Sequence, residues 1–176
     1  GLFDNASINA SGATGGGEVL IGGDFQGKNA EIRNASQTIV AANASITADA
    51  VTNGDGGKVI VWSDQVTTYQ GNISARGGDI VGDGGFVEVS GKAHLNFTGD
   101  VDTYASNGET GTLLLDPKDL VILESGTTDD LIGTPDDTNN NIYAFSEDPA
   151  TDISGGSELK ASRIVTLLET TAVTLQ

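Results

Sequence analysis

The sequence contains neither cysteine nor methionine, and only 3 of its 176 residues are proline. The lack of cysteine excludes a disulfide scaffold, a thiolate metal site and a thiol nucleophile. Basic residues are also scarce: 8 lysines and arginines stand against 25 aspartates and glutamates, which gives a formal net charge of −17. Because this chain lacks the positive charge that neutralises phosphates, we expect no nucleic-acid partner.

Long apolar runs and histidine-based chemistry are missing as well. No stretch approaches the ~18 consecutive apolar residues of a membrane-spanning helix, so we expect the chain not to span a membrane. The sole histidine, His94, has no second ligand or serine nucleophile at a suitable spacing. A zinc site and Ser-His-Asp or Cys-His catalysis are therefore excluded, and we expect that the protein is not an enzyme.

Two short phrases recur along the chain. The first phrase has a pair of small residues, usually two glycines, followed by a short β-strand pattern. It occurs at residues 16–21, 56–61, 84–89 and 110–115. The second has an isoleucine between polar residues and occurs at residues 6–10, 44–48 and 72–75. Intervals of 40, 28 and 26 residues separate the first phrases, and the isoleucines of the second lie 38 and 27 residues apart. The shared spacing indicates one repeating structural unit.

The repeat predicts an all-β fold. Each unit contains two or three short strands with inward Val, Ile or Leu and outward Ser, Thr, Asn or Asp. Such strands cannot bury an apolar face alone, whereas stacked coils of a parallel β-helix (a solenoid) form one continuous core. We expect glycines at the corners, many with positive φ, and an extra partial coil around residues 30–42 in the 40-residue interval. A sandwich of paired sheets is the alternative.

Acidic residues divide the chain into three segments. Residues 1–124 hold 16 acidic and 6 basic residues and are assigned to β-solenoid coils. Residues 125–156 hold 7 acidic and no basic residues and are rich in turn formers, which predicts a long acidic loop. Residues 157–176 predict a short helix and a returning strand of the same domain.

The predicted helix covers residues 157–169. Ser157 is the expected N-cap. An apolar stripe at helical spacing is expected to pack against the coils, and it consists of Ala161, Ile164, Val165 and Leu168.

Several segments resemble the filamentous haemagglutinin-like exoproteins. The resemblance lies in residues 83–92, 97–99, 101–103, 108–120 and 168–176, and the phrase at 111–120 is the most distinctive. These exoproteins are large bacterial surface proteins exported by two-partner secretion through an outer-membrane pore. The resemblance implies a right-handed parallel β-helix, a secreted or cell-surface location, and a role in adhesion or filament building. It carries no catalytic motif, and we expect the chain to be a fragment of a longer one.

Five residues are candidates for binding. Calcium favours oxygen ligands in turns, and the candidates are Asp55 and Asp83, in equivalent turns, and Asp136 and Asp137, in the acidic loop. We expect no other cofactor. Trp62 alternates away from Val61, so we expect it to be partly exposed as a carbohydrate or partner contact.

The function expected from these observations is that of a structural and adhesive segment of a bacterial surface protein. Its expected partners are host cells, surface glycans or further copies stacked end to end through unpaired strand edges. Two alternatives stay open. One is a carbohydrate-active β-helix enzyme that uses clustered carboxylates in a groove with a basic or aromatic clamp. The other is a calcium-stabilised surface module.

Overall fold

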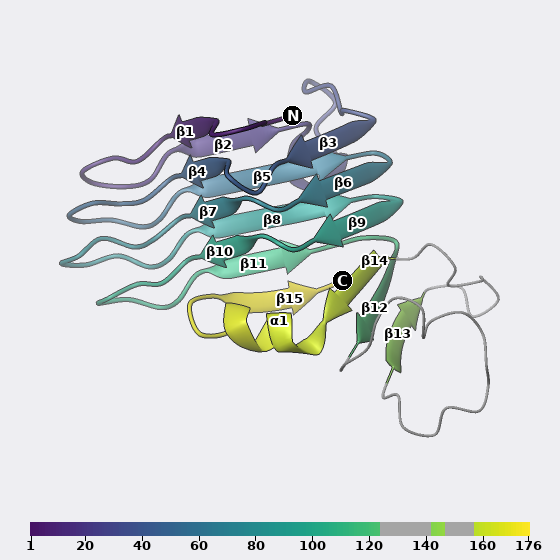
Figure 1. The fold of residues 1–176 in the computed structure, drawn as a ribbon. Coiled ribbons are helices and arrows are strands. Elements are labelled where there is room, and N and C mark those ends of the chain that lie inside the picture. Colours follow the sequence, from purple (N-terminus) through teal and green to yellow (C-terminus); the bar gives the residue numbers. More distant parts are fainter. Residues whose placement is uncertain (124–141, 147–156) are drawn as a thin grey trace.

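The computed structural model describes residues 1–123, 142–146 and 157–176, whose strands form three sheets (Figure 1). Sheet 1 has the order β1-β4-β7-β10, sheet 2 the order β15-β11-β8-β5-β2, and sheet 3 the order β13-β12-β14-β9-β6-β3. Every strand pair in the described residues is parallel except β12 with β13. The fold is therefore all-β with parallel sheets and one short helix in the described part of the chain.

The strands are short, as the sequence predicts. Sheet 1 contains β1 (Ser7–Asn9), β4 (Ser45–Thr47), β7 (Asn72–Ser74) and β10 (Asp100–Asp102). Sheet 2 contains β2 (Glu18–Ile21), β5 (Lys58–Ser63), β8 (Phe86–Gly91), β11 (Thr112–Leu115) and β15 (Ala172–Leu175). Sheet 3 contains β3 (Gln37–Val40), β6 (Val66–Tyr69), β9 (His94–Phe97), β12 (Asp119–Leu123), β13 (Ile142–Ser146) and β14 (Ser157–Lys160). The helical elements are the 3₁₀ turn η1 (Phe25–Gly27) and the helix α1 (Ala161–Leu167).

The first three passes of the chain each add one strand to every sheet, in the order β1 to β3, β4 to β6 and β7 to β9. After them, β10 and β11 continue sheets 1 and 2, whereas β14 lies between β9 and β12 in sheet 3. The isoleucines of the second repeated phrase lie in register, since Ile8 pairs with Ile46 and Ile46 with Ile73. In sheet 2, Val59 pairs with Val87 in the same way. The predicted repeat is therefore confirmed as the register of the parallel sheets.

The core lies between the three sheets and is made of stacked, equivalent side chains. Ile46, Val59 and Val87 are at most 1% exposed. The rings of Tyr69 and Phe97, which are in neighbouring strands of sheet 3, stack with their centroids 5.2 Å apart. Residues one pass apart therefore contact each other, and the core extends along the whole stack.

Glycines at the entrance to sheet 2 let successive passes approach closely. A Cβ atom at Gly57 would overlap the carbonyl oxygen of Gly17, and one at Gly85 would overlap that of Gly57. None of these three glycines has a positive φ, although Gly82, in a corner, does. Close backbone approach, rather than the left-handed conformation that we expected, requires glycine at the repeated positions.

The long first interval does not contain an extra coil, so that prediction is wrong. Residues 37–40 form β3, an ordinary strand of the first pass that pairs with β6. The additional residues lie between β2 and β3, at positions 22–36, and include η1. This insertion, residues 22–36, packs against the outward face of sheet 2, where η1 contacts β5.

The predicted helix is shorter and differently placed. Residues 157–160 form β14, and the side chain of Ser157 accepts the Leu95 N–H (2.7 Å) instead of capping a helix. The helix α1 begins at Ala161 after Lys160, which makes no side-chain cap bond. Pairing with β9 and β12 satisfies the backbone of β14, so the helix starts one turn later than predicted.

The predicted apolar stripe of this helix is only partly correct. Ile164 packs against the core, but Val165 and Leu168 are 64% and 57% exposed. The buried helical residue is Leu167. The shorter helix therefore turns a different side towards the sheets.

The segment predicted as an acidic loop contains a strand. Residues 142–146 form β13, which runs antiparallel to β12. The prediction of a loop is therefore wrong for these five residues, and residues 125–141 and 147–156 lie outside the described part. Within that part, no helix has the length and apolar character that crossing a bilayer requires.

The glycine contacts give a first prediction. The substitution Gly85→Ala places a Cβ against the Gly57 carbonyl and should lower the free energy of unfolding by about 1–3 kcal/mol, as overpacking does. The matched control is Thr110→Ala at an exposed position of an equivalent turn, which should leave it nearly unchanged. Urea denaturation followed by circular dichroism measures both, and equal effects would contradict the packing argument.

Candidate functional site

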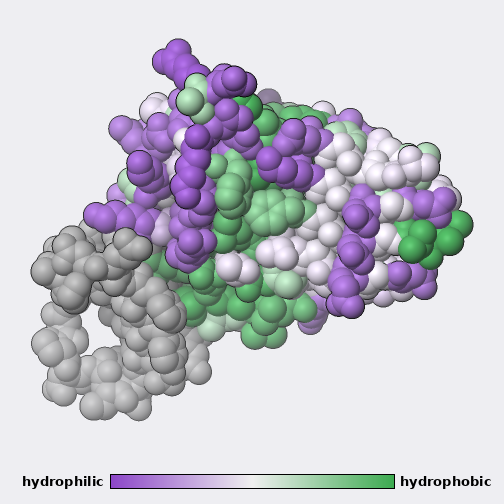
Figure 2. Space-filling model, turned by 180° about the vertical axis from the view of Figure 1, so that it is seen from behind, coloured by the Kyte–Doolittle hydropathy of each residue, from purple (hydrophilic) through white to green (hydrophobic). Residues whose placement is uncertain are grey.

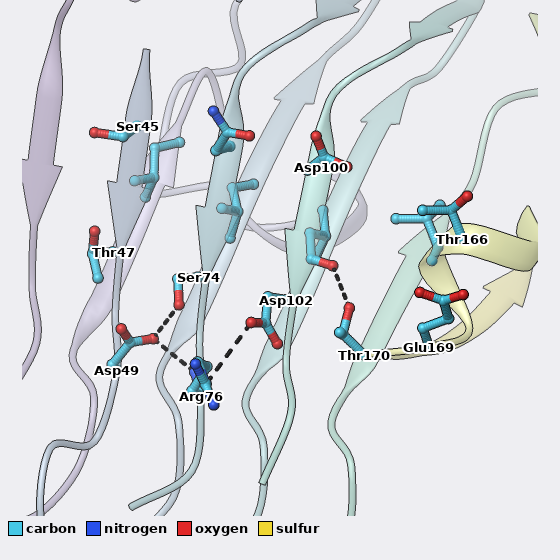
Figure 3. Close-up of a pocket in the computed structure, with 15 residues that line it drawn as sticks. Ser45, Thr47, Asp49, Ser74, Arg76, Asp100, Asp102, Thr166, Glu169 and Thr170 are labelled. Carbon is cyan, nitrogen blue, oxygen red and sulfur yellow. Dashed lines mark hydrogen bonds and ion pairs between the residues drawn. The ribbon is translucent and has the colours of Figure 1, made fainter. Parts of the chain in front are cut away.

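A groove of about 470 Å³ runs across the outward face of sheet 1 (Figure 3). Its floor consists of outward residues from β4, β7 and β10. The end of α1 and the turn after it form one wall, with Thr166, Glu169 and Thr170. The groove therefore brings together polar side chains from several passes of the chain.

The three-residue strands of sheet 1 place these side chains regularly. In each strand the central Ile or Val points inward and the two flanking residues point outward. One outward column contains Ser45, Asn72 and Asp100. The other contains Thr47, Ser74 and Asp102. The groove floor therefore repeats hydroxyl, amide and carboxylate groups from strand to strand, about 4.8 Å apart.

A hydrogen-bonded cluster lies at the ends of these strands. One carboxylate oxygen of Asp49 accepts the Ser74 hydroxyl (2.6 Å) and the Arg76 N–H (2.8 Å). The Arg76 Nε lies 3.8 Å from Asp102 Oδ2, and its guanidinium lies 5.5 Å from the centre of the Tyr104 ring. Because the Arg76 side chain is 46% exposed, it can still bind a ligand in the groove.

The helix closes the groove at one end through an arginine. Arg163 of α1 donates to the carbonyl oxygen of Gly99 and to the carboxylate of Asp100. The hydroxyl of Thr170, in the turn after α1, donates to the carbonyl oxygen of Val101 (3.3 Å). These bonds hold α1 beside β10, so the wall of the groove is fixed in position relative to its floor.

This arrangement is suited to binding a ligand rich in hydroxyl groups. Asp49 and Asp102 accept backbone N–H groups, and Asp100 pairs with Arg163. Carboxylate oxygens can also accept the hydroxyl groups of a ligand, and the exposed Arg76 guanidinium can donate to them.

The predicted calcium candidates have different outcomes. Asp55 and Asp83 do lie in adjacent turns, as predicted: the Asp83 N–H donates to the Asp55 carboxylate (2.8 Å). The Asp83 carboxylate in turn accepts the Glu109 N–H (2.8 Å). Each side chain thus binds the backbone of the next pass, and the described residues contain no cluster of three or more potential metal ligands. Asp136 and Asp137 lie outside the described residues.

Trp62 is buried, so the prediction of partial exposure is wrong. It is only 4% exposed, and its indole N–H donates to the Asp64 carboxylate (3.2 Å). Gly23 and Gly27 of the insertion lie against the ring. The outward direction of Trp62 was predicted correctly, but the insertion covers this face of sheet 2.

Glu88 is a buried acid that the sequence-based predictions missed. It lies on the outward face of sheet 2 with no exposed surface, and its two carboxylate oxygens accept the Gln26 N–H (3.1 and 3.3 Å). The pKa of Glu88 is raised to about 6, mainly by burial and to a smaller extent by nearby Asp116, while hydrogen bonds from Gln26 and Ser90 and the charge of Lys58 oppose the rise. The only sign of this residue in the sequence is a Glu between two valines that point inward. That pattern does not reveal that the insertion covers the side chain.

Figure 2 shows the molecule from behind, on the side where the outward face of sheet 2 lies. Apolar side chains gather in the middle of this view, with hydrophilic side chains around them. Phe25 of the insertion packs edge-on against Phe86 of β8, with the ring centroids 5.8 Å apart. The insertion therefore adds an apolar contact to its polar bonds with Glu88.

The raised pKa gives a second prediction. The stability that protonated Glu88 contributes is fully present below pH 4.5 and is lost as the pH rises through about 6. The difference between the two pKa values corresponds to about 2 kcal/mol. Glu88→Gln should therefore match the wild type near pH 4 and exceed its unfolding free energy by about 2 kcal/mol at pH 8.

Urea denaturation across this pH range measures the effect. The control Glu109→Gln changes an exposed glutamate in a turn and should show no such pH-dependent gain. A stability difference between Glu88→Gln and the wild type that stays constant from pH 4 to pH 8 would contradict the assignment.

No protein-family model and no curated protein matches the chain.

Proposed function

We propose that the chain is a segment of a right-handed parallel β-helix that serves as a structural and adhesive part of a secreted bacterial cell-surface protein. Over the first three passes each of the three parallel sheets gains one strand per pass in constant register, which supports the solenoid. The handedness, the secretion and the bacterial surface location are supported by the resemblance of residues 83–92 and 108–120 to filamentous haemagglutinin-like exoproteins.

The structural role follows from the backbone hydrogen bonds between passes. Each sheet forms a continuous ladder along the stack, which makes a stiff rod that holds binding surfaces away from the cell. β2 and β15 are the outermost strands of sheet 2 at opposite ends. Their outer edges are suited to end-to-end association of copies into a filament.

The adhesive role is carried by the groove on sheet 1. Its hydroxyl, amide and carboxylate groups, together with the Arg76 guanidinium, can donate to and accept from sugar hydroxyls. Because these groups repeat from pass to pass, a glycan lying along the stack can bind several of them at once. A surface glycan is therefore the partner that the groove fits best.

Glycan binding is tested with Arg76→Ala. This variant loses the most exposed donor of the cluster and should bind its glycan about tenfold more weakly. The probe is an array of bacterial and host-cell oligosaccharides, followed by adhesion of beads coated with the protein. Arg33→Ala, an equal change of charge at an exposed position of the insertion, is the control. If no oligosaccharide binds the wild type, or if both variants lose binding equally, the groove is not the adhesive site.

A carbohydrate-active enzyme is the second candidate, because acids and an arginine do share one groove. Asp49 and Asp102 belong to strand positions two passes apart, so their backbones are roughly 10 Å apart, and both lie beside Arg76. Inverting glycosidases hold their two carboxyl groups ~6.5–9.5 Å apart. Against this, both carboxylates accept backbone N–H groups. The bonding thus supports binding without turnover.

Hydrolysis is tested by incubating the wild type and Asp102→Asn with the oligosaccharides that bind, and measuring new reducing ends. We expect none from either protein, because both carboxylates are already engaged by backbone N–H groups. Release by the wild type that Asp102→Asn abolishes would establish the enzyme instead.

A further inference from the structure

The insertion creates a second pocket that the regular repeat lacks. Residues 22–36 separate β2 from β3, whereas only residues 64–65 separate β5 from β6. The pocket has a volume of about 520 Å³ and lies between the insertion and three successive corners of the stack. It is lined by Gln26, Gly27, Asn34, Trp62, Asp64, Lys92, Ala93 and Lys118.

The wall formed by the insertion is firmly held. Asp24 pairs with Lys58 (3.0 Å), and the Gln26 side chain donates to Asp116 (2.8 Å). Hydrogen bonds from Asn29, from the Phe25 N–H and from Lys58 lower the pKa of Asp24 to about 2. Gln26 has a φ of 52°, a left-handed conformation that is unfavourable for a residue with a Cβ and often occurs at binding sites.

The opposite wall contains two lysines on consecutive passes. The Lys118 N–H donates to the Lys92 carbonyl (3.2 Å), so the two residues are stacked, and both are exposed. Like charges at neighbouring positions repel. Among the side chains that the structure describes, neither lysine forms an ion pair, and the same is true of Lys28, Arg33 and Lys160. Two exposed cationic side chains that line one pocket on neighbouring passes favour an anion there.

The floor offers an acceptor beside these cations. Asp64 is exposed, and its Oδ1 accepts the Trp62 indole N–H (3.2 Å) and the Asn34 amide (3.0 Å). These bonds fix the carboxylate at the pocket, where its other oxygen can accept a hydroxyl group. A small inorganic anion would not use this acceptor, but a sugar would.

We propose that this pocket binds an acidic sugar, with its anionic group between Lys92 and Lys118 and its hydroxyl groups donating to Asp64. The site rests on the proposed adhesive function and adds a second, charge-selective contact to the groove on sheet 1. Because the chain has a net charge of −17, an anionic ligand can be attracted only at a local pair of cations. The same charge disfavours long polyanions such as nucleic acid. A carboxylate and a sulfate group both satisfy the lysines.

Binding is measured by calorimetry at low salt with three probes: oligogalacturonate, sulfated dextran oligosaccharide and neutral dextran. We expect the wild type to bind at least one acidic probe and not the neutral one. The double variant Lys92→Gln/Lys118→Gln should bind that probe about tenfold or more weakly and lose most of the salt dependence. Asp64→Asn should weaken binding while the salt dependence is retained, because no cation is removed.

Lys160→Gln is the control, since this lysine is exposed at the end of β14 and does not line the pocket. Binding of oligogalacturonate or of the sulfated probe identifies the anionic group. Equal affinity for neutral dextran, no binding of any acidic probe, or an equal loss in Lys160→Gln would overturn the proposal. The proposed function is judged separately, because Arg76→Ala alters only the groove on sheet 1.

Discussion

The close approach of successive passes is the constraint on which the rest of the structure depends. Just before sheet 2 the backbones of two passes come so close that a Cβ would overlap a carbonyl oxygen of the neighbouring pass, so nothing larger than hydrogen fits there. Gly17, Gly57 and Gly85 meet this requirement, and the valines two residues after them then stack in the core. The outward columns of sheet 1, and with them the groove, inherit the same register.

Much of the fold could be predicted because a repeat shows its register directly in the sequence. Ile8, Ile46 and Ile73 align by their repeated phrase alone, and they pair as aligned. The insertion could not be predicted in this way. Residues 22–36 occur once, so no second copy reveals where the regular strand resumes. β14 escaped prediction for a similar reason: its partners β9 and β12 are distant in sequence.

The candidate site was less predictable than the fold. Asp55 and Asp83 share a repeated turn and were correctly placed together, but their bonds to backbone N–H groups depend on the offset between turns. Arg76 and Asp49 belong to different passes and have no motif in common, so only the stacked structure brings them into one cluster. Trp62 was correctly directed outward, and its burial follows from the insertion, a segment that occurs only once in the described part of the chain.

The acidity of the chain has a structural cause that also explains why its few cations matter. Carboxylates at the corners accept N–H groups of the next pass, as Asp49, Asp55 and Asp83 do, and each such bond works best with an ionised acceptor. A stack built in this way accumulates negative charge with every pass. Some cations pair with carboxylates, as Lys58 does with Glu18 and Asp24. Lys92 and Lys118 instead line one pocket on neighbouring passes, so they concentrate positive charge at one place on an otherwise acidic chain, and that place is where an anionic group is attracted most strongly.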